Sequence, residues 1–215
     1  MVASIGPGRD PLASPQIALS AADRLTLRHF RKTLPKSASA SFTHSFAAIM
    51  DAERPFATDR ATHGHLVVGA CVVSAYRAWM THGLDPVAAT ARTREPTITI
   101  GKRTIASMMR LTAFFSKDAF ESVRAYTQHR TDTAFGPSFD IHYADMEDGF
   151  VSEVTRCGYQ SFLRRHDALD LLELFCEWDR TWIDALPKAI RFHRPHTIAL
   201  DGARCRYEFR RDETP

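Results

Sequence analysis

The spacing of apolar residues changes abruptly along this chain, at Gly136-Pro137. Before that point apolar residues recur every three or four positions, most clearly from Leu66 to Trp79. After it, Phe139, Ile141 and Tyr143 alternate with polar residues. The first spacing is typical of helices and the second of strands with one buried face. The sequence therefore predicts an α+β fold, with a mostly helical N-terminal two-thirds packed against a small, mainly antiparallel C-terminal sheet.

Residues that favour helix ends divide the helical part into segments. Ser20 and Asp23 form the pattern of a capping box, and Asp85 followed by Pro86 is a typical helix start. Gly83 is expected to end the helix before it. We expect helices over residues 20–34, 41–50, 66–83, 85–93, 98–115, 116–126, 157–165 and 168–186. We expect strands over residues 139–143, 150–154, 190–192, 197–200 and 205–209, with turns at Asp145–Gly149 and Asp201-Gly202.

Length and composition favour one folded domain. The chain has 215 residues, of which 44% are hydrophobic, and this is enough to bury one substantial core. We expect the domain to span residues 19–211. Residues 1–18 begin with a stretch rich in Ser, Pro, Gly and Ala and are expected to form a disordered tail.

The charge pattern and the lack of long apolar runs argue against two classes of partner. The 28 basic and 25 acidic residues are interspersed and give a net charge of +3, so the sequence does not predict nucleic-acid binding. No apolar run reaches the ~18 residues that a membrane-spanning helix needs. The four cysteines have no secretion signal beside them, so we expect reduced thiols and a cytoplasmic protein. The oligomeric state is left open.

Cys157 follows a predicted strand and opens a predicted helix. A thiol at a helix N-terminus faces free backbone N–H groups, and Arg156 adds a neighbouring positive charge. Both effects are expected to lower the pKa of the Cys157 thiol and to favour a nucleophilic thiolate. The alternative is that Cys157 is a small buried side chain at the corner between strand and helix.

Cys176 and Asp179 lie three residues apart, so both can face the same side of one helix. Leu172 indicates that this side is largely buried, and a buried carboxylate needs a cationic or hydrogen-bonding partner. The alternative for Asp179 is a structural salt bridge. Cys205 alternates with Tyr207 on the last predicted strand, where core packing is the alternative.

The remaining cysteine and the paired histidines indicate no further site. Cys71 lies in the most apolar predicted helix, and we expect it in the core. His63 and His65 lack a third ligand at the spacing of a metal site. The sequence has no glycine-rich phosphate loop, no nucleophile elbow and no His-Glu-x-x-His motif.

The motifs that contain the last three cysteines follow one another in a defined order. They are Asp148-Gly149-Phe150 leading to Arg156-Cys157, then Phe175-Cys176-x-x-Asp179, then Thr197-Ile198-Ala199, then Asp201-Gly202-x-x-Cys205-x-Tyr207-x-Phe209. Upstream, Tyr76-Arg77-Ala78-Trp79 precedes Gly83-Leu84-Asp85-Pro86. This order resembles that of the L-2-amino-thiazoline-4-carboxylic acid hydrolase family over residues 65–209, with the specific motifs confined to residues 148–209. Asp201 departs from the family pattern, in which a second glycine is expected before Gly202.

The resemblance implies an enzyme that hydrolyses a carbon–nitrogen bond, other than a peptide bond, in a small cyclic amidine or a related heterocycle. It implies Cys157 as the nucleophile and Asp179 as the acceptor of two parallel hydrogen bonds from the amidinium. Cys176 and Cys205 are further catalytic candidates that would line the site. The implied partner is a small-molecule substrate, and no cofactor or metal is expected.

Substrate-binding candidates lie next to the same motifs. Arg156 or Arg204 would hold a substrate carboxylate. Asp148 and Thr197 are candidates for further substrate contacts.

Two other functions remain open on the sequence. One is a tailoring enzyme of the same fold that forms or rearranges rings, or forms bonds, in the biosynthesis of a specialised metabolite. The other is a small-molecule or metal-binding protein in which Cys157, Cys176, Asp179 and Cys205 hold a soft ion such as zinc. The metal content of the purified protein separates the second alternative from both enzymes.

Overall fold

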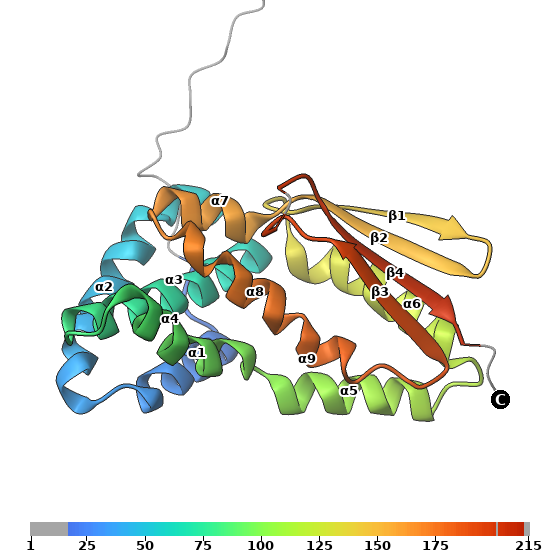
Figure 1. Ribbon diagram of the computed structural model, residues 1–215, viewed down its shortest axis with the longest axis horizontal. Helices are drawn as coiled ribbons and strands as arrows, with labels where there is room; N and C mark the ends of the chain where they lie inside the picture. Colours follow the sequence, from blue (N-terminus) through green and yellow to red (C-terminus); the bar gives the residue numbers. More distant parts are fainter. Residues whose placement is uncertain (1–16, 201, 213–215) are drawn as a thin grey trace, which may run out of the picture.

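The computed structural model describes residues 17–200 and 202–212 (Figure 1). All but the last two residues of the expected tail, residues 1–18, lie outside this described part. The helices are α1 (Ala21–Thr33), α2 (Ser39–Ala52), α3 (Arg60–Thr81), α4 (Pro86–Ile98), α5 (Lys102–Phe114), α6 (Ala119–Arg130), α7 (Gly158–Arg165), α8 (Leu172–Trp178) and α9 (Arg180–Ile183). Short 3₁₀ turns cover Lys36–Ala38, Arg54–Phe56 and Leu169–Leu171, and a π-helical turn, η4, covers Thr131–Phe135. The strands are β1 (Asp140–Met146), β2 (Gly149–Arg156), β3 (Ile190–His196) and β4 (Cys205–Arg211).

The sheet lies at one end of the molecule, and helices α1 to α4 lie at the other (Figure 1). Its strands pair antiparallel in the order β1-β2-β4-β3. Helices α1 to α6 come first along the chain, and the sheet forms in the C-terminal part, where α7 to α9 lie between β2 and β3. The predicted α+β class is therefore confirmed.

Helix α3 forms the centre of the helical part, because most of its surface is buried. Val67 and Cys71 are completely buried, and α1, α2, α4 and α7 pack around this helix. Helix α7 approaches α3 closely at Gly69, where an added Cβ would lie only 2.7 Å from the ring of Phe162. This close approach holds the first turn of α7, which Cys157 caps, between α3 and the sheet.

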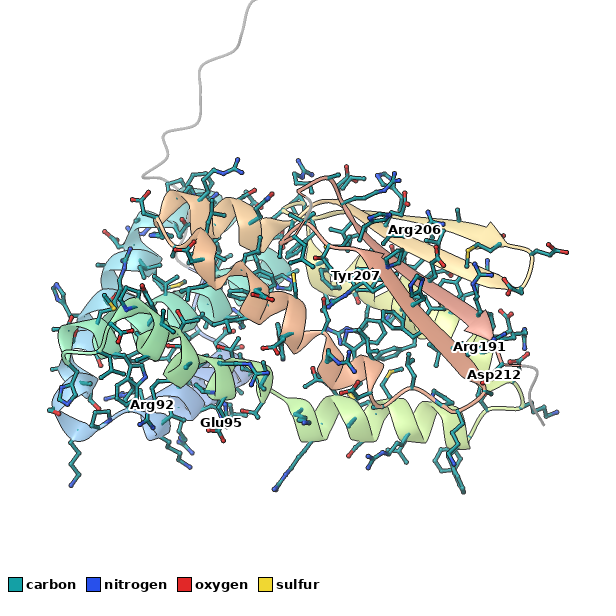
Figure 2. The ribbon with its side chains drawn as sticks, in the orientation of Figure 1. Arg92, Glu95, Arg191, Arg206, Tyr207 and Asp212 are labelled. Atoms are coloured by element: carbon teal, nitrogen blue, oxygen red, sulfur yellow. The ribbon has the colours of Figure 1, made fainter. Side chains whose placement is uncertain are left out.

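Strand pairing aligns side chains in rows across the sheet. Two rows are Ile141–Val154–Cys205 and Tyr143–Ser152–Tyr207. We call the side of the sheet that carries these rows the cavity face. Side chains alternate along a strand, so Arg206, next to Tyr207, belongs to the opposite side, which we call the outer face (Figure 2).

The outer face carries a continuous series of ion pairs. Arg206 contacts Glu153 at 2.6 Å and Glu208 at 2.8 Å. Arg210 contacts Glu208 at 3.4 Å and Asp148, in the turn between β1 and β2, at 3.0 Å. Charges of opposite sign across neighbouring strands support the strand pairing.

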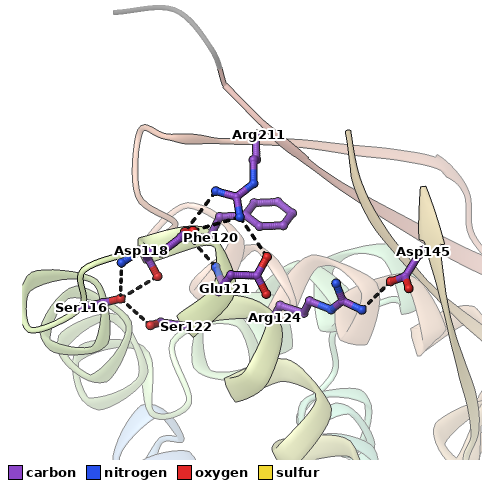
Figure 3. A network of polar contacts seen from close by, with 8 residues as sticks. All are labelled: Ser116, Asp118, Phe120, Glu121, Ser122, Arg124, Asp145 and Arg211. Carbon is purple, nitrogen blue, oxygen red and sulfur yellow. Dashed lines mark hydrogen bonds and ion pairs between the residues drawn. The ribbon is translucent and has the colours of Figure 1, made fainter. Parts of the chain in front are cut away.

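A polar network fastens α6 to the sheet (Figure 3). Asp118 caps the start of α6 and pairs with Arg211 at the end of β4 at 2.9 Å. Glu121 contacts the same guanidinium at 2.9 Å, and Arg124 pairs with Asp145 on β1. These contacts tie α6 to two strands, and its C-terminal end reaches the cavity face of the sheet.

Several helices differ in extent from those expected. The segment over residues 98–115 is broken at Gly101, whose φ of 63° is a conformation that glycine adopts at little cost. The segment over residues 168–186 is broken at Asp179. The Trp182 N–H donates to the Asp179 carbonyl, three residues back, at 3.2 Å, which is the hydrogen-bond spacing of a 3₁₀ turn. Helix α6 runs past the expected end at residue 126 and continues into the π-helical turn.

The prediction of a strand over residues 197–200 is wrong. These residues form a turn, in which the Leu200 N–H donates to the Thr197 carbonyl at 3.0 Å. The connection between β3 and β4 is therefore longer than the hairpin expected at Asp201-Gly202, and Asp201 itself lies outside the described residues. Because Ile198 is not part of a strand ladder, its N–H is available to the Cys205 sulfur.

Candidate active site

A cavity of about 150 Å³ lies between the cavity face of the sheet and the helices α6 to α9. All four catalytic candidates, Cys157, Cys176, Asp179 and Cys205, line it. The rest of the wall is largely aromatic: Tyr126, Phe135, Phe139, Tyr143, Tyr159, Phe175, Trp178, Trp182, Tyr207 and Phe209. An empty apolar cavity of about 150 Å³ accommodates a molecule the size of benzene, so this one suits a small ring.

Asp179 lies at the junction of α8 and α9 and has several partners. The Tyr207 hydroxyl donates to Asp179 Oδ2 at 2.7 Å, and the Arg194 guanidinium lies 3.5 Å from the same oxygen. Burial raises the pKa of the Asp179 carboxyl, although hydrogen bonds from Tyr207 and Trp182 and the charge of Arg194 oppose this shift. The side chain keeps 32% of its surface accessible, which is consistent with its place in the cavity wall. Asp179 thus has the donor partners that a buried carboxylate requires.

Cys205 and Cys176 both line the cavity, and each thiol shifts the pKa of the other. The Cys176 thiol lowers the pKa of Cys205 by donating to its sulfur, and the Ile198 N–H adds a second hydrogen bond at 3.3 Å. The same contact raises the pKa of Cys176, which stays a protonated donor. Of these two thiols, Cys205 is therefore the one poised to ionise.

Cys157 caps α7 as expected, but its thiol does not become acidic. Burial raises the pKa of Cys157 to about 11, and the nearby backbone N–H groups of Gln160 and Tyr159 only partly offset this rise. The Arg156 guanidinium donates to the Pro137 carbonyl at 3.0 Å. The expected lowering of the Cys157 pKa is therefore wrong, because desolvation of the thiolate outweighs the helix N-terminus.

A histidine and a tyrosine form a second polar pair in the cavity wall. Burial lowers the pKa of His65 to about 4, so its ring is neutral. His65 Nε2 lies 2.8 Å from the Ala134 carbonyl, which can only accept, so this nitrogen carries the proton. His65 Nδ1 then accepts from the Tyr159 hydroxyl at 2.7 Å. No local pattern indicates this pair, since Tyr159 lies 94 positions from His65.

Arg130 also lines the cavity and was not among the expected site residues. It is the last residue of α6, and the π-helical turn Thr131–Phe135 follows it directly. Two more residues of this segment, Thr131 and Phe135, line the cavity as well. The predicted helix ends near residue 126, so Arg130 could not be placed at the site from the sequence.

The four substrate-binding candidates do not line the cavity. Asp148 belongs to the ion pairs of the outer face, and Arg204 lies 3.7 Å from Glu153 of that face. Arg156 is exposed at the end of β2, and Thr197 is buried in the turn before β4. Asp148 lies in the turn between β1 and β2, and Arg204 directly precedes β4, so neither belongs to the cavity face of a strand.

The four cysteines are free thiols. Within residues 17–200 and 202–212, no three His, Cys, Asp or Glu side chains are arranged to hold a metal ion. The arrangement of donors therefore gives no support to the soft-metal alternative. In the same part of the chain, every helix is too short or too polar to cross a membrane.

Comparison with known proteins confirms the resemblance seen in the motifs. The profile of one family, described as L-2-amino-thiazoline-4-carboxylic acid hydrolase, matches residues 64–209, which is more than half of the chain. The matched segment contains every cavity residue named above. No curated protein and no solved structure matches the chain. The chain belongs to the L-2-amino-thiazoline-4-carboxylic acid hydrolase family.

Proposed function

We propose that the protein hydrolyses a small cyclic amidine and that the cavity is its active site. One observation carries the proposal: a thiol poised to ionise, Cys205, and a desolvated carboxylate, Asp179, line the same aromatic cavity. A thiolate is a good nucleophile toward an amidine carbon, and a carboxylate binds an amidinium through two parallel hydrogen bonds. The family description names a hydrolase of such a ring, an amino-thiazoline.

Cys205 is the proposed nucleophile. Its sulfur receives the Ile198 N–H at 3.3 Å and the Cys176 thiol, and both donors stabilise the thiolate. Cys157 is the weaker candidate, because burial raises the pKa of its thiol to about 11. Cys176 acts as a donor to Cys205, and Cys157 forms part of the cavity wall.

Asp179 is proposed to bind and orient the amidinium. A carboxylate has about four acceptor positions, so the contacts with Tyr207 and Arg194 leave capacity for a substrate. Burial makes the ionised carboxylate costly when the cavity holds no cation, as its raised pKa reports. A cationic amidinium removes this cost and places its carbon in the cavity with Cys205.

The proposed reaction consumes one water and needs no oxidant or reductant. The Cys205 thiolate adds to the carbon between nitrogen and sulfur, and the electron pair of the carbon–nitrogen double bond moves to nitrogen. The ring carbon–sulfur bond then breaks, and the ring sulfur leaves as a thiolate that takes up a proton. Water adds to the same carbon, and the bond to Cys205 breaks. The amidine unit becomes a urea, and the product is an N-carbamoyl amino acid with a free thiol.

Ring opening by the purified full-length chain tests this proposal. The substrate is 2-amino-2-thiazoline-4-carboxylate, and new thiol is titrated with a disulfide reagent after the protein is removed by filtration. Mass spectrometry of the filtrate should show a product heavier than the substrate by one water. Heat-denatured protein and Cys205→Ser protein are the controls. A native protein that releases no thiol above the denatured control, at any pH between mildly acidic and mildly alkaline, contradicts the proposal.

A further inference from the structure

The cavity contains two side chains of opposite formal charge. Among its lining residues in the described part of the chain, Asp179 and Arg130 are the only members of the Asp, Glu, Lys and Arg group. They come from different elements, since Asp179 joins α8 to α9 and Arg130 ends α6. The charge of Arg130 acts on the pKa of Asp179 and Tyr159, although burial is the larger cause of both shifts. Arg130 therefore lies within electrostatic reach of the candidate catalytic groups.

The guanidinium of Arg130 has no hydrogen-bond or salt-bridge partner within the described protein. Asp179 has Tyr207 at 2.7 Å and Arg194 at 3.5 Å, whereas the Arg130 side chain forms no hydrogen bond or salt bridge with any residue in 17–200 and 202–212. Arg130 is half-buried in the cavity wall, and its N–H donors are free to bind a ligand. A guanidinium in a largely aromatic wall is a strong and directional partner for an anionic ligand.

The backbone around Arg130 is unusual and well anchored. The π-helical turn Thr131–Phe135 begins at the next residue, and such turns occur frequently at functional sites. The Thr131 hydroxyl shares a hydrogen bond with the Tyr143 hydroxyl on β1 at 2.8 Å. Phe135 stacks on His65, with ring centroids 5.4 Å apart. These contacts fix the end of α6 relative to the sheet, and so fix the position from which Arg130 extends.

We propose that Arg130 is the anion-binding residue of the cavity and that it selects substrates carrying a carboxylate. A planar guanidinium binds a carboxylate through two parallel N–H donors, which sets orientation as well as affinity. This inference rests on the proposed function, because it assumes that the amidinium end of the ligand lies at Asp179. The preferred ligand is then a small zwitterionic ring, held by Asp179 at its positive end and by Arg130 at its negative end.

The position of Arg130 has one simpler explanation. A cation in the last turn of a helix interacts favourably with the helix C-terminus, and Arg130 lies in the last turn of α6. That role affects stability but gives no preference between an anionic and a neutral ligand. His129 occupies the same turn and is exposed, so it offers a comparison for the stability effect alone.

Ligand preference therefore tests the proposal, and binding can be separated from turnover by using Cys205→Ala protein. Isothermal calorimetry compares 2-amino-2-thiazoline-4-carboxylate with 2-amino-2-thiazoline, which lacks only the carboxylate. The Cys205→Ala protein, which is the parent of the variants below, should bind 2-amino-2-thiazoline-4-carboxylate about tenfold or more tightly than 2-amino-2-thiazoline. This is the difference expected for a charged hydrogen-bonded pair. Adding Arg130→Gln should remove most of this preference while leaving the affinity for 2-amino-2-thiazoline unchanged.

Matched variants give the controls. Arg156→Gln and Arg204→Gln remove cations outside the cavity and should keep the preference of the parent. His129→Gln should alter thermal stability at most. If Arg130→Gln does not fold, Arg130→Met keeps the apolar stem of the side chain and provides the same comparison.

The proposal is overturned if the Arg130 variant keeps the parent's preference, if Arg156→Gln or Arg204→Gln removes it, or if the parent binds neither compound. Turnover of the unsubstituted protein is scored separately. Ring opening with a preference that does not depend on Arg130 would reject the anion site and retain the hydrolase. An Arg130-dependent preference without ring opening would retain the anion site and reject the hydrolase.

Discussion

The two faces of β4 place neighbouring residues in opposite environments. On the cavity face, Cys205 and Tyr207 are buried and stand beside Asp179. On the outer face, Arg206 and Glu208 belong to a series of ion pairs in which each charge has a partner. The polar groups of the outer face pair with one another and hold the strands together. The polar groups that line the cavity still have hydrogen-bonding positions open to a ligand.

The carboxyl groups on the two sides of the sheet have pKa shifts of opposite sign. Burial raises the pKa of Asp179, whereas a hydrogen bond from Arg206 lowers the pKa of Glu208. Shifts caused by desolvation inside a cavity are common at functional sites, while exposed ion pairs contribute little to stability. This contrast assigns the chemistry to the cavity face.

The largest expected effect comes from two substitutions at adjacent residues of β4. Cys205→Ser should lower the rate of ring opening by at least about 10³-fold, because a hydroxyl in that place does not ionise as the thiol does. The serine hydroxyl still accepts from the Ile198 N–H, so the fold should persist. Arg206→Gln, one residue further on, should leave the rate unchanged. Equal loss in the two variants, measured as turnover per folded molecule, would remove the distinction between the faces.

The next effect concerns the carboxylate of the cavity. Asp179→Asn keeps the shape of the side chain and removes its charge, so turnover or ligand affinity should fall by about tenfold or more. Thermal melts on the same samples show whether the loss is one of folding. If Asp179→Asn melts early yet works normally per folded molecule, Asp179 has a structural role only.

The pH dependence of stability should have opposite signs on the two faces. The raised pKa of Asp179 means that its contribution is complete below the unfolded pKa of about 3.9 and is lost as pH rises through the folded value. Asp179→Asn should therefore gain stability relative to the unsubstituted protein as pH rises. The lowered pKa of Glu208 gives the reverse: its contribution is present above about 4.3, so Glu208→Gln should lose relative stability as pH rises. Urea titrations at several pH values measure the free energy of unfolding of each variant relative to the unsubstituted protein. If this difference changes with pH in the same direction for Asp179→Asn and Glu208→Gln, the contrast between the faces is contradicted.

The smallest effect is expected at the turn between β1 and β2. Asp148 pairs with Arg210 where both side chains remain well exposed, so the pair contributes little to stability. Asp148→Asn should leave turnover unchanged and shift the melting temperature less than either cavity variant. A specific loss of turnover would restore Asp148 as a substrate-binding residue.

The sequence predicted the positions of the cavity thiols better than their chemistry. The spacing of Cys176 and Asp179, and the alternation of Cys205 with Tyr207, are local patterns, and all four side chains line the cavity. The pKa of Cys157 was predicted with the wrong sign, because the extent of burial is set by the packing of distant segments.

Other features of the site depend on contacts that no local pattern records. Arg130 reaches the cavity only because α6 continues past residue 126 and its start is tied to the sheet by Asp118 and Arg211. The Ile198 N–H reaches Cys205 only because residues 197–200 form a turn where a strand was predicted. The fold class needed only the change of apolar period near residue 136, which is a local signal.

Identification of the cysteine that becomes covalently attached to substrate tests the central claim most directly. Protein is mixed with 2-amino-2-thiazoline-4-carboxylate in single-turnover amounts and quenched in acid, and its peptides are mapped by mass spectrometry. We expect the substrate mass on the peptide that contains Cys205, and no adduct on Cys205→Ser protein. An adduct on Cys157, or product formation by the Cys205→Ser protein at the normal rate, would contradict it.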